Sequence, residues 1–352
     1  MVKPILAGVA VVALAVGVGG YALTAGAPAA PKGGCPALVS VAPYAANFVA
    51  YGDLATLRNS SFAHRLSPGS SAGSGYSANS PLPQEYQEFI RATDFHFERD
   101  LDHVMLEGSI ESAAGGLILE GRFDQEKISS YVAKLGTKTH YDSGDVYLFP
   151  THAATGTVAL MFLDPKRLAI TMGKSAETQA LILADAARRA NPSSHEELCE
   201  RAERVSGAPF FMVGDIPKSG ILAMAALAAR DHDGAADLIQ SLDGWDFATW
   251  ADHDNLRIEF EGEYASRLDA LKARIAFEKV RREIQKAGAE AKSVAAANSA
   301  VGPAVDSLVK NFGVALDGRY LRFSTSLSQS DLESLQRAAT SMAAPVPPTS
   351  RR

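Results

Sequence analysis

The chain has 352 residues, and its 34 Lys+Arg against 40 Asp+Glu give a formal net charge of -6 at pH 7. With 47% hydrophobic and 21% charged residues it has the composition of a globular protein, which excludes a wholly disordered chain, a polytopic membrane protein and a small disulfide scaffold. The acidic balance argues against a nucleic-acid partner, because such binding needs a basic surface.

The chain begins with an apolar segment. Residues 4–23 carry no charged side chain and follow Lys3. A helix of about 20 apolar residues matches the thickness of a bilayer core, so we predict that residues 1–29 are a signal anchor or a signal peptide, with the lipid bilayer as its partner. The side chains expected in the membrane are Pro4, Ile5, Leu6, Val9, Val11, Val12, Leu14, Val16, Val18, Tyr21 and Leu23.

Anchor and signal peptide differ in whether this segment is removed. The apolar run is longer than a typical signal core, which favours a retained anchor, whereas Ala27-Pro28-Ala29 offers a small-x-small cleavage site. A lipoprotein is the least favoured reading, since Lys32-Gly33-Gly34 precedes Cys35 where a lipobox needs an aliphatic residue. Lys3 on the short side places the bulk outside the cytoplasm. We expect a single-pass inner-membrane protein or, after cleavage, a secreted or periplasmic one.

The two cysteines lie far apart in the sequence. Cys35 belongs to a Pro/Gly linker over residues 30–43, and Cys199 lies in a stretch with helical character over 195–205. An oxidising compartment permits a bridge between them. Separation in sequence does not define the geometry that a bridge requires, so we expect a linker thiol and a half-buried helical thiol rather than a disulfide.

After the linker, residues 44–194 and 195–340 follow one pattern twice. The matched segments are Phe48–Leu54 with Phe210–Ile216, Leu117–Phe123 with Ile258–Tyr264, and Phe162–Ile170 with Ala315–Phe323. They occur in the same order at unequal spacing, which indicates a domain duplication with insertions rather than a solenoid. The third pair carries Asp-Pro and Asp-Gly at the same place, turn dipeptides that join two strands into a hairpin.

Each half reads as strand, helix, two strands, helix and closing hairpin. This order predicts an α+β fold of two tandem related domains, with antiparallel sheets and helices on one face. A ferredoxin-like arrangement is the nearest named form.

Four further segments complete the pass along the chain. Residues 67–83 form a Ser/Gly/Pro loop that we expect to be flexible, and residues 341–352 a disordered tail. Helical spacing of apolar residues predicts a helix over 124–135 and a long one over about 267–297. Charges of both signs on the long helix are typical of a solvated face.

Three stretches carry a resemblance, namely Arg99–Val104, Glu120–Ile128 and Arg204–Pro209. Together they resemble a family of uncharacterised bacterial cell-envelope proteins, over about residues 44–335. The resemblance implies an N-terminal hydrophobic segment and a duplicated α+β body. It implies no established activity and no catalytic residues.

Several short motifs have a simpler structural interpretation than a functional one. Met172–Ser175 lacks the second glycine of a phosphate loop, because Leu168 holds that position, and Ser175 is a good helix N-cap. Asp231–Gly234 and Asp252–Asn255 do not have the spacing of a calcium loop and suit turns.

Two histidines lie near an acidic run. His96 and His103 flank Glu98, Asp100 and Asp102 without a zinc spacing, which favours a strand edge. We therefore assign no catalytic, cofactor-binding or metal-binding residue and expect no cofactor.

Residues 221–229 form an apolar run too short to cross a bilayer. A buried core helix is the simplest interpretation, and the alternative is a surface for a partner or ligand made by Ile221, Leu222, Met224 and Leu227. The sequence does not determine the function. It favours a non-enzymatic envelope protein that presents two α+β modules to an envelope partner. A carrier for a small apolar ligand comes second, and a hydrolase with a dispersed site third.

Overall fold

The computed structural model describes residues 35–43, 45–58, 84–109, 114–150, 156–189, 196–215, 241–252, 255–278, 282, 311–328 and 330–331. The predicted membrane segment, the 67–83 loop, the 221–229 run and the 341–352 tail lie outside the described residues.

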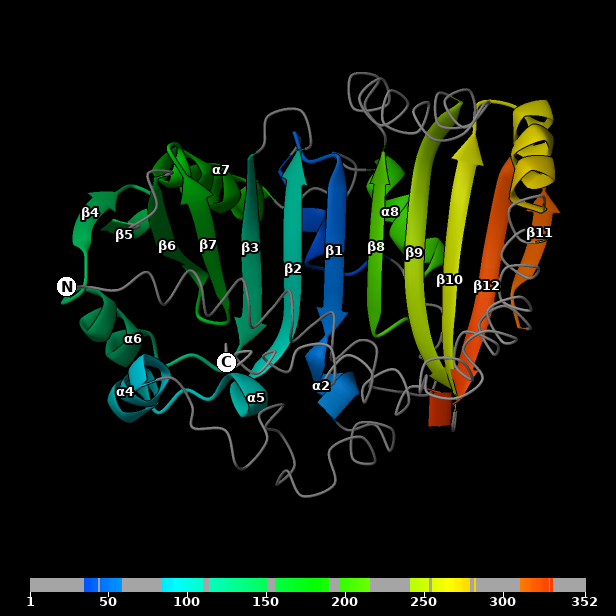
Figure 1. Cartoon of the computed structure of the whole chain (residues 1–352). Helices are drawn as coiled ribbons and strands as arrows, with labels where there is room; N and C mark the ends of the chain where they lie inside the picture. Colours follow the sequence, from blue (N-terminus) through cyan, green and yellow to red (C-terminus); the bar gives the residue numbers. More distant parts are fainter. Residues whose placement is uncertain are drawn as a thin grey trace, which may run out of the picture.

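Twelve strands of the described part form one antiparallel sheet (Figure 1). In one direction from its middle lie β1 (Phe48–Asp53), β2 (Leu101–Ser109), β3 (Ala114–Gly121), β7 (Arg167–Gly173), β6 (Thr157–Asp164), β5 (Gly144–Pro150) and β4 (Thr137–Tyr141). In the other direction lie β8 (Phe210–Asp215), β9 (Leu242–Asp252), β10 (Asn255–Tyr264), β12 (Tyr320–Ser328) and β11 (Gly313–Asp317). We call these strand sets the first half and the second half.

The halves meet where β1 pairs antiparallel with β8, with Ala50 opposite Met212. Outward from this joint, the order β1-β2-β3-β7-β6 has the same pattern as β8-β9-β10-β12-β11. The three sequence matches fall on corresponding strands, β1 with β8, β3 with β10, and the β6–β7 hairpin with the β11–β12 hairpin. The sheet is therefore continuous where separate sheets were expected. Its consecutive neighbours β1, β2 and β3 also differ from a ferredoxin-like order.

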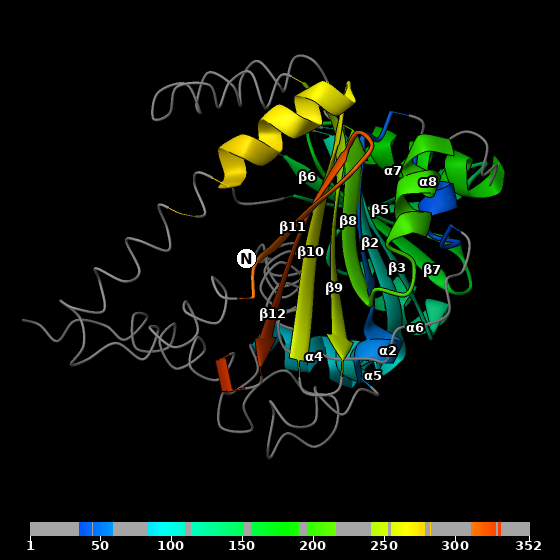
Figure 2. The same ribbon diagram turned by 90° about the vertical axis from the view of Figure 1, so that its right-hand side faces the viewer.

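Helices lie on both faces of the sheet (Figure 2). One face, which we call the α7 face, carries η1 (Val39–Val41), α7 (Ala176–Arg189) and α8 (Glu196–Arg204). The opposite face, which we call the α4 face, carries α4 (Gln84–Thr93), α5 (Phe97–Asp100), α6 (Gln125–Val132) and the helix of residues 267–278, drawn in yellow in Figure 2. A short helix, α2 (Leu54–Arg58), follows β1.

The prediction of helices on one face is wrong for a physical reason. Strand β3 buries Leu117 and Leu119 on one side and Ile118 on the other. Side chains alternate between faces along a strand, so a strand that is apolar at successive positions needs cover on both sides.

Several predicted elements are present with close bounds. The helix expected over 124–135 is α6, which starts where the Asp124 side chain accepts the Lys127 N–H at 3.1 Å. The helix expected after Ser175 is α7, and the stretch 195–205 contains α8. The β4–β5 hairpin was not predicted.

One row of directly opposite residues shows the chemistry of the α4 face from edge to edge. It runs through Lys138, Tyr147, Leu160, Ile170, Leu117, Leu106, Ala50, Met212, Phe247, Phe260, Phe323 and Val314. All but the first are apolar or aromatic, so the α4 face is apolar through both halves.

The adjacent row lies on the α7 face. It runs through Thr137, Leu148, Ala159, Thr171, Gly116, Glu107, Val49, Val213, Asp246, Glu261, Arg322 and Ala315. Charged residues occupy three successive strands of the second half in this row. The α7 face therefore changes character where β8 meets β9.

Candidate functional site

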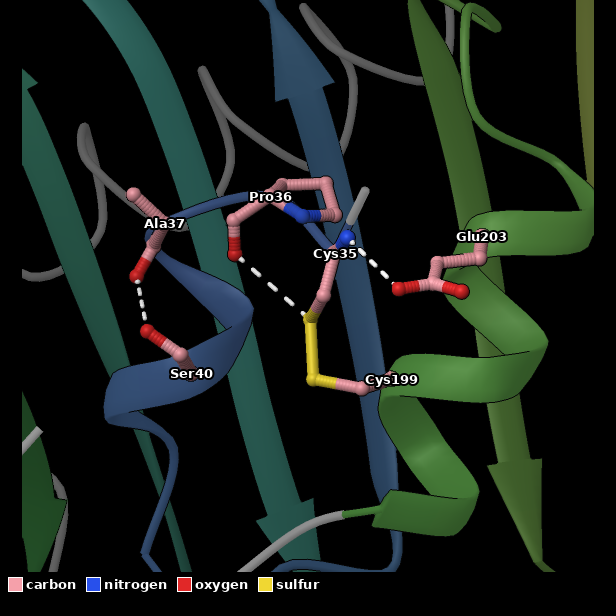
Figure 3. The surroundings of a disulfide bond; sticks show 6 residues. All are labelled: Cys35, Pro36, Ala37, Ser40, Cys199 and Glu203. Atoms are coloured by element: carbon pink, nitrogen blue, oxygen red, sulfur yellow. Dashed lines mark hydrogen bonds between the residues drawn. A yellow bond between two sulfur atoms is a disulfide. The ribbon is translucent and has the colours of Figure 1, made fainter. Parts of the chain in front are cut away.

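Helix α8 is joined to the stretch of chain just before η1 by a disulfide between Cys35 and Cys199, whose Cα atoms are 5.0 Å apart (Figure 3). Beside it, the Cys35 N–H donates to Oε1 of Glu203 at 3.1 Å. The expectation of two separate thiols is thus wrong. The reason is packing, since η1 and α8 bury Val39, Val41 and Ala202 in one cluster, which brings the two cysteines together.

The other side of α8 contacts a network of charged residues on the second half. Arg201, only 6% exposed, donates to Asp215 at 2.9 Å and forms a close ion pair with Glu263. Gly244 makes room for it, because a Cβ there would lie 2.1 Å from the Arg201 Cζ atom. Removing one partner of such a buried pair leaves an uncompensated charge, so the pair ties α8 to the sheet.

Arg204 continues this network one turn along α8. Its guanidinium lies 3.3 Å from Asp246 and 3.4 Å from Glu261, and over the ring of Tyr320 at 5.2 Å. Burial, followed by the negative charge of Glu261, raises the pKa of Asp246 to about 7 despite the contact with Arg204.

The outer part of the network is open to solvent. Arg322 lies 2.7 Å from Glu261 with about half of its side chain exposed, and Arg319 pairs with Glu263. Carboxylates and guanidiniums here neutralise one another. The arrangement is a fixed ionic surface rather than a site with a reactive group.

A second group of polar residues lies at one end of the first half. His103 on β2 is 3.3 Å from Glu120 on β3 and 3.7 Å from Asp53 on β1. The hydrogen bond with Glu120 raises the pKa of His103, and Asp53 adds to the effect. Glu120 also lines an open cavity of about 320 Å³ with residues 164–167 of the β6–β7 turn.

The described neighbours of His103 are acidic and aromatic. Both carboxylates that face His103, those of Asp53 and Glu120, come from the first half. Side-chain contacts of His103 are to carboxylates and to the stacked ring of Tyr51. Three or more His, Cys, Asp or Glu side chains placed to hold a metal do not occur in the described part.

A small apolar cavity of about 40 Å³ lies between the sheet and the helices α4 to α6. Its lining consists of Phe89, Phe95, Phe97, Leu119, Phe123, Ile128, Val132, Phe149, Val158, Leu160, Leu168 and Ile170. With only apolar groups around it, such a cavity stays dry.

The helix of residues 267–278 has apolar side chains on two opposite sides. Ala270 and Ala273 are buried against the sheet, whereas Leu268, Leu271 and Ile275 are 61%, 41% and 62% exposed. We call these three exposed side chains the apolar ridge. Exposed apolar side chains gathered on one helix face mark a contact surface.

The site residues inferred from sequence cannot be placed. Ile221, Leu222, Met224 and Leu227 lie outside the described residues, as does the membrane segment from Pro4 to Leu23. None of the helices in the described ranges is long and apolar enough to cross a membrane. Sequence reasoning missed the disulfide and the Arg201 network, although the i, i+3 spacing of Arg201 and Arg204 was a visible signal.

No protein-family model and no curated protein matches the chain. Three solved structures of the protein TP0453 are similar. Crystal form IV has TM-score 0.43 and 11% identity, covering 84% of this chain and 95% of the other. Crystal form III has TM-score 0.42 and 12% identity, covering 86% of this chain and 97% of the other. Crystal form I has TM-score 0.39 and 11% identity, covering 86% of this chain and 98% of the other. At TM-scores under 0.5 this likeness carries no argument about the chain.

Proposed function

We propose that this chain is a non-enzymatic protein of the bacterial cell envelope, tethered to the inner membrane or released from it, whose two related α+β modules bind an envelope protein. The observation that carries the proposal is the Cys35–Cys199 disulfide. Disulfides form and persist outside the reducing cytosol, so this bond supports the export suggested by the N-terminal segment.

The duplication is part of this proposal. Matching strand order on both sides of the β1–β8 joint supports descent from one repeated module. The first module adds the β4–β5 hairpin, and the second carries the ionic network. Different chemistry on a shared framework suits a protein that offers two surfaces.

The apolar ridge supports partner binding. Its test is a photo-crosslinking residue placed at Ile275 in cells, with the same residue at Ile182 as control, because Ile182 is also an exposed isoleucine on a helix. We expect a discrete crosslinked protein from position 275 and none from position 182. Equal or absent crosslinking at both positions would contradict the proposal.

A carrier of a small apolar ligand is the second candidate, favoured by the apolar cavity under α4. A cavity this small suits a single small apolar molecule, so xenon is the probe. We expect xenon to shift the NMR signals of the cavity methyl groups of Leu119 and Leu160. The Ile128→Phe variant, which fills the space, should lose that shift, and unshifted signals in the wild type would exclude the site.

A further inference from the structure

Strand β11 is the last strand at one edge of the sheet in the described part of the chain. In the described residues it pairs with β12 alone. Counted outward from the β1–β8 joint, β11 corresponds to β6, and β6 carries a further antiparallel strand, β5, with Val146 opposite Met161. In the first half, therefore, an antiparallel strand, β5, occupies the position that corresponds to the outer side of β11.

We propose that a second copy of this chain pairs with β11, antiparallel, across a two-fold axis at Ala315. The inference rests on the duplication proposed above. In the symmetric register Gly313 lies opposite Asp317, Val314 opposite Leu316, and Ala315 opposite its own copy. Such an interface is isologous, the commonest form of homodimer.

The residues of β11 suit this register. Ala315 is exposed and small. Asp317 is the one charged residue of the strand and faces Gly313 of the second copy, so no like charges meet. Val314 and Leu316 lie on the apolar α4 face, where they would pair across the axis.

The opposite edge of the sheet has different chemistry. Strand β4 carries Lys138 and His140, both paired with Asp145 on β5. Charged residues, lysine above all, protect an edge strand from pairing with another chain. The contrast makes β11 the receptive edge and provides a matched control.

The short strand sets the strength of the contact. Five residues from each copy bury less than the roughly 1,200–2,000 Å² of a standard interface. We therefore expect a weak dimer whose population rises with protein concentration.

A cysteine at the axis tests the register. The two native cysteines are joined to each other, so Ala315→Cys adds a single free thiol. Directly opposite residues have Cα atoms about 4.5–5.5 Å apart, within the range of a disulfide. We expect mild oxidation to give a covalent dimer with Ala315→Cys and not with Thr139→Cys, at the centre of β4. Equal crosslinking at both edges, or none at position 315, would overturn the inference.

Charge substitutions test the symmetry. Ala315→Lys places two lysines opposite each other and beside Arg322, so its dimer affinity should fall at least tenfold. Mixing it with Ala315→Glu should restore a mixed dimer. An Ala315→Lys variant that dimerises like the wild type would refute the pairing, as would a wild type that stays monomeric at every concentration. Those results leave the export and crosslinking tests of the proposed function untouched.

Discussion

The two halves of the sheet share a strand order but differ in chemistry on the α7 face. Under α7, Leu183 packs directly over Gly116 among mainly apolar side chains, with the buried Glu107 carboxyl beside it. Under α8, Arg201 and Arg204 meet carboxylates of β8, β9 and β10. The comparison teaches that one strand order can carry a helix held mainly by apolar packing and another in which ion pairs add to that packing.

The largest effect should come from the buried ion pair. Arg201→Met leaves Glu263 and Asp215 without this partner, and we expect a loss of about 3–5 kcal/mol in the free energy of unfolding. Chemical denaturation measures it. The control is Arg189→Met, which breaks an exposed pair with Asp185 and should cost under about 1 kcal/mol. A loss of under 1 kcal/mol for Arg201→Met would mean that the network does not hold α8.

The apolar half should respond to a cavity instead. Leu183 is fully buried, and Leu183→Ala should cost about 2–5 kcal/mol independently of salt. Its neighbour Ile182 is 40% exposed on the same helix, so Ile182→Ala should cost much less. Similar losses in both variants would show that α7 packs differently.

A titration of the Glu107 carboxyl would sharpen the comparison. Burial raises its pKa from 4.5 to about 7, and its Oε1 atom lacks a hydrogen-bond partner among the described residues. Between these two pH values the folded state binds more protons than the unfolded state, so the stability of the wild type falls as pH rises through the window and then levels off.

Glu107→Gln removes this titration. We expect the free energy of unfolding of the variant, relative to that of the wild type, to rise by on the order of 3 kcal/mol between pH 5 and pH 8. Urea denaturation at each pH measures this change. Glu126→Gln, at an exposed position of α6, should show no such gain. If the difference in free energy of unfolding between Glu107→Gln and the wild type is the same at both pH values, the Glu107 carboxyl is exposed to solvent and the account of its burial is wrong.

The smallest effect is expected at the rim of the network. Arg322 is half exposed, and Glu261 keeps its contact with Arg204 when Arg322 is removed. Arg322→Met should therefore cost at most about 1 kcal/mol, and less at high salt. Thermal melts at two salt concentrations measure this loss. A loss as large as that of Arg201→Met would show that burial of the arginine does not decide how much its ion pair stabilises the fold.

Local patterns in the sequence predicted elements but not their assembly. Apolar alternation and turn dipeptides located β3, β10 and both closing hairpins, because these depend on neighbouring residues. The β4–β5 hairpin also had a signal, the turn residues Asp142–Gly144 between two β-rich runs.

The features that the sequence did not reveal depend on distant contacts. The single sheet requires β1 to pair with β8, about half the chain away. The disulfide spans 164 residues, and the charged network gathers side chains from five elements, α8, β8, β9, β10 and β12. No local period encodes such meetings, because the residues that meet are far apart in the sequence.

The most direct test of the account is the thiol state of the chain isolated from cells. The protein is taken from native membranes with an alkylating reagent present, and its intact mass is measured before and after reduction. The account predicts no added alkyl group before reduction and two after it, because Cys35 and Cys199 are joined during export. Two alkyl groups before reduction would contradict both the bond and the envelope location.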